Sequence, residues 1–159
     1  MDYEYEVLDN GTIIITKYNG NEKDIVIPEK IDGKIVSVID TEAFEGHSEI
    51  NSVVIPKTIQ EIYQYAFGGC RNLKKVYISN GLTFMDDFVF DACDHMEEIT
   101  FEEGTNVSIN YLTVDENLKG CTIKAGDNCS KSIYEQCLLA ATINENQELI
   151  KEYKNRLGK

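Results

Sequence analysis

The sequence predicts an α+β solenoid, a short right-handed coil with a period of 23 residues, closed by an N-terminal β-hairpin and a C-terminal helical cap. Three observations predict this fold. A shift of 23 positions superimposes three segments that begin at Ile39, Ile62 and Met85. Two alternating apolar runs surround an Asn-Gly pair near the start, and apolar residues recur at helical spacing after Ser130.

Each repeat combines a short strand with a turn. In the strand, Val76 and Ile78 lie two residues apart and therefore point to one face, whereas Tyr77 between them points outward. In the turn, an apolar residue such as Ile62 precedes Ala66 by four positions and Phe67 by five. This spacing favours one helical or 3₁₀ turn. A single coil cannot close a core, so the repeats must bury these residues by stacking.

A weaker fourth copy follows the three repeats. Its strand pattern is Leu118, Cys121 and Ile123, one residue short of the 23-residue spacing, and Tyr111-Leu112 replaces the Phe pair. We therefore expect the coil to continue for one degenerate turn after residue 107.

The two ends carry signals for capping elements. Asn10-Gly11 predicts a type I′ hairpin over the open N-terminal edge. Ile27 precedes Ile55 by 28 residues, one period plus an insertion of five, and the insertion predicts a second small hairpin at Asp32-Gly33. At the other end, Ser132 and Glu135 form the pattern of a capping box before one or two helices broken near Asn144.

These elements predict one domain over residues 1–159. Residues 1–38 form the hairpin cap and a first partial coil, and 39–107 form the three repeats. Residues 108–129 form the degenerate fourth repeat, and 130–159 form the helical cap.

The stretch VVIPKTIQEIYQYAFGGCRNLKKVYI, which begins at Val53, resembles the BspA-type leucine-rich repeats. Their usual form has Ile-Pro after the strand, Ala-Phe on the turn, Cys three residues after Phe and Leu three further on. The match runs from about Asp24 to Phe101, and it departs where His47 replaces the Cys and Ser79 replaces the Pro. The resemblance implies a leucine-rich-repeat coil of the kind often found on bacterial surface or adhesion proteins that bind host or matrix proteins.

The charge balance excludes several partners. The chain has 28 Asp or Glu against 15 Lys or Arg, a net charge of -13, which argues against nucleic acid and anionic membranes. No apolar run reaches the ~18 residues of a membrane helix, so we expect no membrane insertion. The first ten residues lack the pattern of a signal peptide, which predicts a cytoplasmic protein if the chain is complete; family resemblance predicts a secreted or surface protein if it is trimmed.

The acidity is concentrated in one part of the chain. Residues 76–118 contain ten acidic residues and no Lys or Arg. We define an acidic patch by five of them: Asp86, Asp87, Asp91, Asp94 and Glu97. It is either a site for a basic partner or weakly held calcium, or a solvated face that keeps the solenoid soluble.

The outward-facing strand residues are the candidate partner-binding site on the predicted concave sheet. Two rows are expected, one of Ser52, Lys75 and Glu98, the other of Val54, Tyr77 and Thr100. Repeat proteins usually bind through this surface, and an aromatic residue beside a charge is enriched at interfaces. The alternative is an exposed strand face without a ligand.

Little in the sequence predicts catalysis. The five cysteines lack a CxxC pair and are expected to be free buried thiols, so we predict no catalytic residue, metal or cofactor. The leading hypothesis is a non-enzymatic protein-protein interaction module, with an unidentified protein partner, that is a monomer or a weak dimer. Two alternatives stay open: a structural self-assembly unit, and a thiol- or His-dependent enzyme that uses Cys70, Cys93, His47 or His95.

Overall fold

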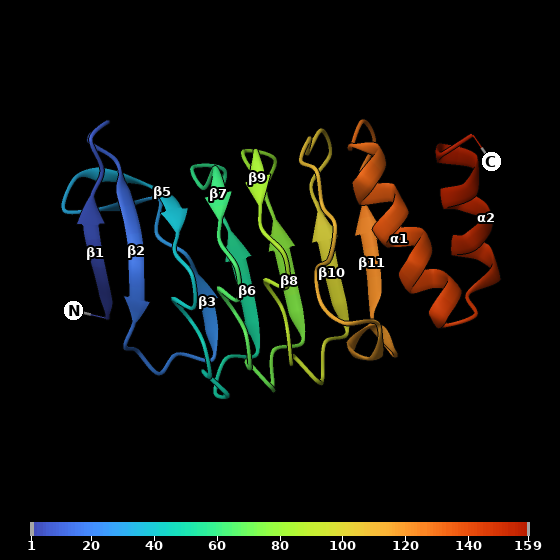
Figure 1. Cartoon of the computed structure of the whole chain (residues 1–159), viewed down its shortest axis with the longest axis horizontal. Helices are drawn as coiled ribbons and strands as arrows, with labels where there is room; N and C mark the ends of the chain where they lie inside the picture. Colours follow the sequence, from blue (N-terminus) through green and yellow to red (C-terminus); the bar gives the residue numbers. More distant parts are fainter. Residues whose placement is uncertain (1, 159) are drawn as a thin grey trace.

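The computed structural model describes residues 2–158 and confirms the solenoid, whose coils follow one another along the long axis (Figure 1). The strands are β1 (Tyr3–Val7), β2 (Ile13–Tyr18), β3 (Asp24–Val26), β4 (Lys30–Ile31), β5 (Lys34–Ile39), β6 (Ser52–Ile55), β7 (Glu61–Ile62), β8 (Lys75–Ile78), β9 (Phe84–Met85), β10 (Glu98–Phe101) and β11 (Thr122–Ala125). The helices are η1 (Asp115–Leu118), α1 (Lys131–Ile143) and α2 (Gln147–Arg156).

The strands form two sheets. One is wholly parallel, in the order β11-β10-β8-β6-β3, and the other runs β1-β2-β5-β7-β9. Val76 lies opposite Val53 on one side and Ile99 on the other, so the repeat period sets the register of the parallel sheet. The coils that carry β6 and β8 each add a shorter strand, β7 and β9, to the second sheet. Among the described residues, no strand of the second sheet follows β10 or β11.

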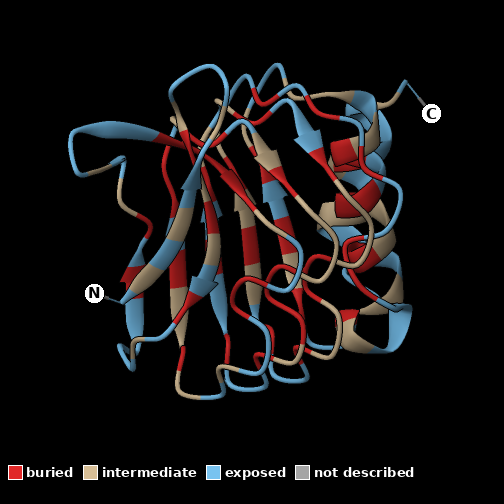
Figure 2. Ribbon diagram, turned by 60° about the vertical axis from the view of Figure 1, so that its left-hand side comes forward, coloured by how far each residue is buried: buried red, intermediate tan, exposed pale blue. Residues whose placement is uncertain are grey.

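The core lies between the two sheets, and the strand residues in Figure 2 alternate between buried and exposed. Phe44, Phe67 and Phe90 stack one above another, with ring centroids 4.7 and 5.7 Å apart. All three are buried, and burial of such a side chain contributes about 1.5–3 kcal/mol. The repeated Phe therefore holds neighbouring coils together, as the periodicity predicts.

The expected helical or 3₁₀ turn is not a helix, although its hydrogen bonds have the 3₁₀ spacing, as from Ala66 N to Tyr63 O at 3.2 Å. Ile62 belongs to the short strand β7, and residues 64–69 form consecutive hydrogen-bonded turns instead. The reason is the backbone of Tyr65, whose φ of 58° cannot continue a right-handed helix. Backbone bonds then run between coils, as from Phe67 N to Val89 O at 2.9 Å.

Both hairpins near the N-terminus are present, and the type of the first turn differs from the prediction. Gly11 has a φ of 82°, Asn10 is not in the left-handed region, and Leu8 N donates to Thr12 O at 2.8 Å. These features fit a three-residue loop with glycine in the left-handed position rather than a type I′ turn. In the second hairpin, β4 pairs with β5, and both Asp32 and Gly33 have positive φ.

The fourth repeat pairs in a different register from the one expected. Ile123 lies opposite Ile99, and Ala125 lies opposite Phe101, a spacing of 24 residues. The predicted alignment of Cys121 with Ile99 is therefore wrong, because the loop with η1 adds one residue where a deletion was expected. Cys121 is buried just before β11.

Two helices cover the last coil, and they separate at Asn144 as predicted (Figure 1). The predicted capping box is wrong, because α1 begins at Lys131 and Ser132 lies inside its first turn. The Ser132 hydroxyl instead donates to Val107 O at 3.0 Å and accepts from Ile109 N at 3.0 Å. It therefore fastens the helix to the preceding loop. No helix in residues 2–158 is long and apolar enough to cross a bilayer.

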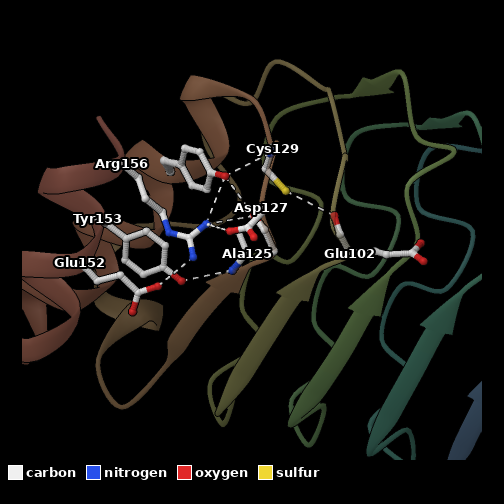
Figure 3. A network of polar contacts seen from close by, with 9 residues as sticks. Glu102, Ala125, Asp127, Cys129, Glu152, Tyr153 and Arg156 are labelled. Carbon is white, nitrogen blue, oxygen red and sulfur yellow. Dashed lines mark hydrogen bonds and ion pairs between the residues drawn. The ribbon is translucent and has the colours of Figure 1, made fainter. Parts of the chain in front are cut away.

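A polar network joins α2 to the loop after β11 (Figure 3). The Arg156 guanidinium donates to Asp127 Oδ1 at 3.0 Å and to Glu152 Oε1 at 3.2 Å. The Tyr153 hydroxyl accepts from Ala125 N at 3.2 Å. Since Tyr153 is buried, this bond satisfies a polar atom inside the cap.

Candidate interaction surface

The outward side of the parallel sheet, here called the sheet face, presents two rows of side chains. Each of its five strands contributes one residue to each row, because side chains alternate along a strand. The first row is Asp24, Ser52, Lys75, Glu98 and Thr122. The second row is Val26, Val54, Tyr77, Thr100 and Lys124.

The second row begins with an exposed apolar stripe. Val26 is 68% exposed, Val54 is 37% exposed and Tyr77 is 39% exposed. These residues lie opposite one another on the neighbouring strands β3, β6 and β8. The stripe is contiguous across three strands, and Thr100 and Lys124 continue the row with polar groups.

Charged side chains flank the stripe. The Lys124 ammonium lies 3.2 Å from Glu98 Oε2, and its hydrogen bond lowers the pKa of the Glu98 carboxyl. The Ser52 hydroxyl donates to Asp24 Oδ1 at 2.7 Å. Lys75 has no ion-pair partner among the described residues, although it lies beside Glu98 in the row. Its ammonium is therefore available to an external group.

The structure brings together all six predicted sheet residues in the two expected rows. Val26, whose exposed fraction is the largest in the stripe, was not predicted. The offset between Ile27 and Ile55 in the sequence could have predicted it, because the same offset aligns Val26 with Val54. Lys124 was missed because the fourth repeat was aligned in the wrong register.

The acidic patch lies along one coil, from the turn after β9 to the residue before β10. Glu97 lies 3.9 Å from the Lys74 ammonium, and Asp94 accepts from the Asn117 amide at 3.3 Å. Within residues 2–158, no group of three or more His, Cys, Asp or Glu side chains is positioned to hold a metal ion. A basic partner for this patch stays a prediction.

All five cysteines are free and four are buried, as predicted, whereas Cys129 is partly exposed. Cys70 and Cys93 are buried, and each Sγ donates to a backbone carbonyl of the preceding coil at 3.2 Å. Burial raises the pKa of the Cys70 thiol to about 12, so the reactive thiolate is strongly disfavoured. Packing therefore accounts for both cysteines.

The two histidines occupy different positions of the repeat. The His47 ring lies 2.5 Å from Glu49 Oε1 through Nδ1 and 2.9 Å from Tyr18 O through Nε2. The Nδ1 of His95 lies 2.8 Å from Arg71 O, on another coil. The structure therefore does not gather the thiols and imidazoles into one open site.

Comparisons with known proteins agree with this architecture. A family model described as the BspA type leucine rich repeat region matches residues 17–153, in six copies. A leucine-rich repeat protein from Bacteroides capillosus has the same fold, with a TM-score of 0.68 and 24% identity over 79% of this chain and 94% of that chain. A leucine rich cell surface protein from Faecalibacterium prausnitzii gives a TM-score of 0.56 and 24% identity over 82% of this chain and 42% of that chain. No curated protein matches significantly.

Proposed function

The chain belongs to the BspA-type leucine-rich-repeat family, and from this premise we propose that it is a non-enzymatic module that binds a protein through its sheet face. The observation that carries the proposal is the exposed stripe of Val26, Val54 and Tyr77. A contiguous apolar row with an aromatic side chain and flanking charges has the composition of a protein interface rather than of an ordinary solvated surface.

The surface suits a partner that presents an extended apolar segment with an acidic group beside it. The stripe offers apolar contact across three strands, and the free ammonium of Lys75 lies in the row alongside Tyr77. One fold neighbour is a cell surface protein. We extend that setting to this chain as part of the proposal: it displays the sheet face to a protein outside the cell.

Affinity capture from the native source, read by mass spectrometry, tests the assignment. We compare the wild-type chain with a double variant, Lys75→Glu and Tyr77→Ala, which alters only exposed side chains of the sheet face. A matched double variant, Lys57→Glu and Tyr63→Ala, makes the same chemical changes away from that face. Thermal melts confirm that both variants fold.

The proposal predicts a specific pattern of loss. Proteins captured by the wild type and by the Lys57-Tyr63 variant should disappear with the Lys75-Tyr77 variant. Equal capture by all three chains would show that the sheet face is not the binding site. If both variants lost the captured proteins equally, capture would depend only on the charge or the stability of the chain. This result would also contradict the assignment.

Self-assembly is the second candidate, and one observation favours it. β1 is the last strand of its sheet and pairs only with β2 among the described strands, so one edge offers unpaired backbone groups to another copy. Glu4 and Glu6 lie on this strand, and charges on an edge oppose pairing. Light scattering at several concentrations shows whether the edge pairs with another copy. A mass that stays at 18.0 kDa excludes self-assembly.

A further inference from the structure

A second row of aromatic side chains lies on the turns rather than on the sheet face. Tyr65, Phe88 and Tyr111 occur 23 residues apart, one on each of three successive coils. Their rings stack nearly parallel, with centroids 6.2 Å apart for Tyr65 and Phe88 and 5.5 Å apart for Phe88 and Tyr111. Tyr111 is 58% exposed, and the other two are partly exposed. The stack therefore borders solvent and is separate from the buried Phe stack.

The side chain of Glu42 extends this row onto a fourth coil. Glu42 occupies the equivalent position one coil before Tyr65. The φ angles of Glu42, Tyr65 and Phe88 are 58°, 58° and 57°. Since the three residues share one unusual backbone conformation on stacked coils, their side chains leave the chain in the same direction. Glu42 N also donates to Gln64 O at 3.2 Å, so Glu42 lies on the coil next to the Tyr65 end of the aromatic stack.

The charges around the row are all of one sign. The turn segments 40–46, 63–69 and 86–92 contain no Lys or Arg, whereas Glu45, Asp87 and Asp91 belong to these segments. Glu42 is exposed, and its carboxylate has no hydrogen-bond or ion-pair partner among the described residues. A ring beside an unpaired carboxylate is complementary to a guanidinium, which stacks on an aromatic face and pairs with a carboxylate at once.

We propose that the aromatic row of Tyr65, Phe88 and Tyr111, together with the Glu42 carboxylate, is a second interaction surface that binds an arginine-bearing basic segment of a partner protein. One arginine lies between the Glu42 carboxylate and the Tyr65 ring. The acidic side chains along the turns attract the remaining basic residues of the segment. The surface is distinct from the sheet face, so the two assignments stand or fall separately.

The test uses a fluorescein-labelled peptide with five arginines separated by glycines, and the same peptide with lysines. Anisotropy titrations on the whole chain give the Kd. Tyr65→Leu removes the ring, and Glu42→Gln removes the carboxylate. Each should raise the Kd of the arginine peptide about 3- to 10-fold. The lysine peptide should bind more weakly than the arginine peptide, because an ammonium does not stack on a ring as a guanidinium does.

Matched controls separate a local site from attraction by the net charge. Tyr77→Leu removes an exposed ring from the sheet face, and Glu103→Gln removes an exposed carboxylate elsewhere. Both should leave the Kd within about 1.5-fold of the wild type, since they lie outside the row. Equal effects of Glu42→Gln and Glu103→Gln, equal binding of the two peptides, or no binding would each overturn the proposal. Glu42 is exposed and unpaired, so this variant folds even where Tyr65→Leu does not.

Discussion

The Asn144 side chain closes the last coil by holding Gly120, whose backbone N–H donates to Asn144 Oδ1 at 2.6 Å. The amide nitrogen of the same side chain donates to Leu118 O at 2.8 Å and to Cys121 O at 2.9 Å. One residue at the end of α1 thus satisfies backbone groups of the degenerate fourth repeat. In this repeat the Asn144 side chain supplies backbone hydrogen bonds that strand pairing supplies in the regular coils.

We expect Asn144→Ala to lower the free energy of unfolding by about 2–3 kcal/mol, because it leaves partly buried carbonyls without donors. Urea unfolding followed by circular dichroism measures the change. Lys151→Ala, an exposed substitution on α2, is the control and should change stability by less than about 0.5 kcal/mol. If Asn144→Ala changed the free energy of unfolding by a similarly small amount, water would be replacing the hydrogen bonds of the Asn144 side chain.

A second prediction concerns a backbone position that repeats along the coil. Gly46, Gly69 and Ala92 are equivalent, and their φ angles are 75°, 69° and 52°. Ala92 therefore has a side chain in a conformation that favours glycine. We expect Ala92→Gly to raise the melting temperature by about 1–4 °C, corresponding to about 0.5–1 kcal/mol.

The reciprocal variant is the control for this prediction. Gly46→Ala meets no atom within 4 Å, so only the strained backbone acts on it, and we expect a loss of about 1 kcal/mol. If both variants changed stability in the same direction, backbone strain would not be the cause.

The sequence predicted the coil because its signal is redundant. Phe44, Phe67 and Phe90 repeat in one register, and each copy supports the same assignment. The sheet rows follow from that register by simple alternation, so Lys75 and Tyr77 were placed correctly without structural information.

The failures lie where a local motif competes with a tertiary contact. Ser132 fits a capping box, but it bonds to Val107 and Ile109, which no local pattern reveals. The left-handed backbone of Tyr65 was also missed, since a bulky residue in that conformation is rare and its propensity argues against it. The 23-residue spacing of the aromatic row is visible in the sequence, but the helical or 3₁₀ turn that the pattern predicts does not reveal that these side chains share one direction.

A third prediction tests how closely the coils approach. A Cβ added to Gly81 would lie 1.8 Å from the carbonyl oxygen of Lys57 on the neighbouring coil. Because both groups belong to the backbone, no side-chain rotation relieves the clash. We expect Gly81→Ala to cost about 3 kcal/mol or more, measured as a fall in the urea midpoint. A variant as stable as the wild type would show that the coils move apart freely at this position.

The last prediction concerns alkaline pH, because burial raises the pKa of the Cys70, Cys121 and Cys137 thiols to about 12 each. In the unfolded chain a thiol ionises near pH 8.5. Between these values the folded protein keeps protons that the unfolded chain releases. The stabilising contribution is therefore complete below about pH 8.5 and is lost as the pH rises toward 12.

Each such thiol should make the free energy of unfolding fall by about 1.4 kcal/mol per pH unit above pH 9. Urea unfolding at pH 7.5, 9, 10 and 10.5 gives the slope for the wild type and for Cys70→Ala. The variant should be less stable at pH 7.5, because it leaves a cavity, yet its stability should decline less steeply with pH. Because the two proteins differ only at residue 70, the difference between their slopes isolates the effect of that thiol. Parallel curves would mean that the Cys70 thiol ionises as readily in the folded protein as in the unfolded chain, against its burial between the coils.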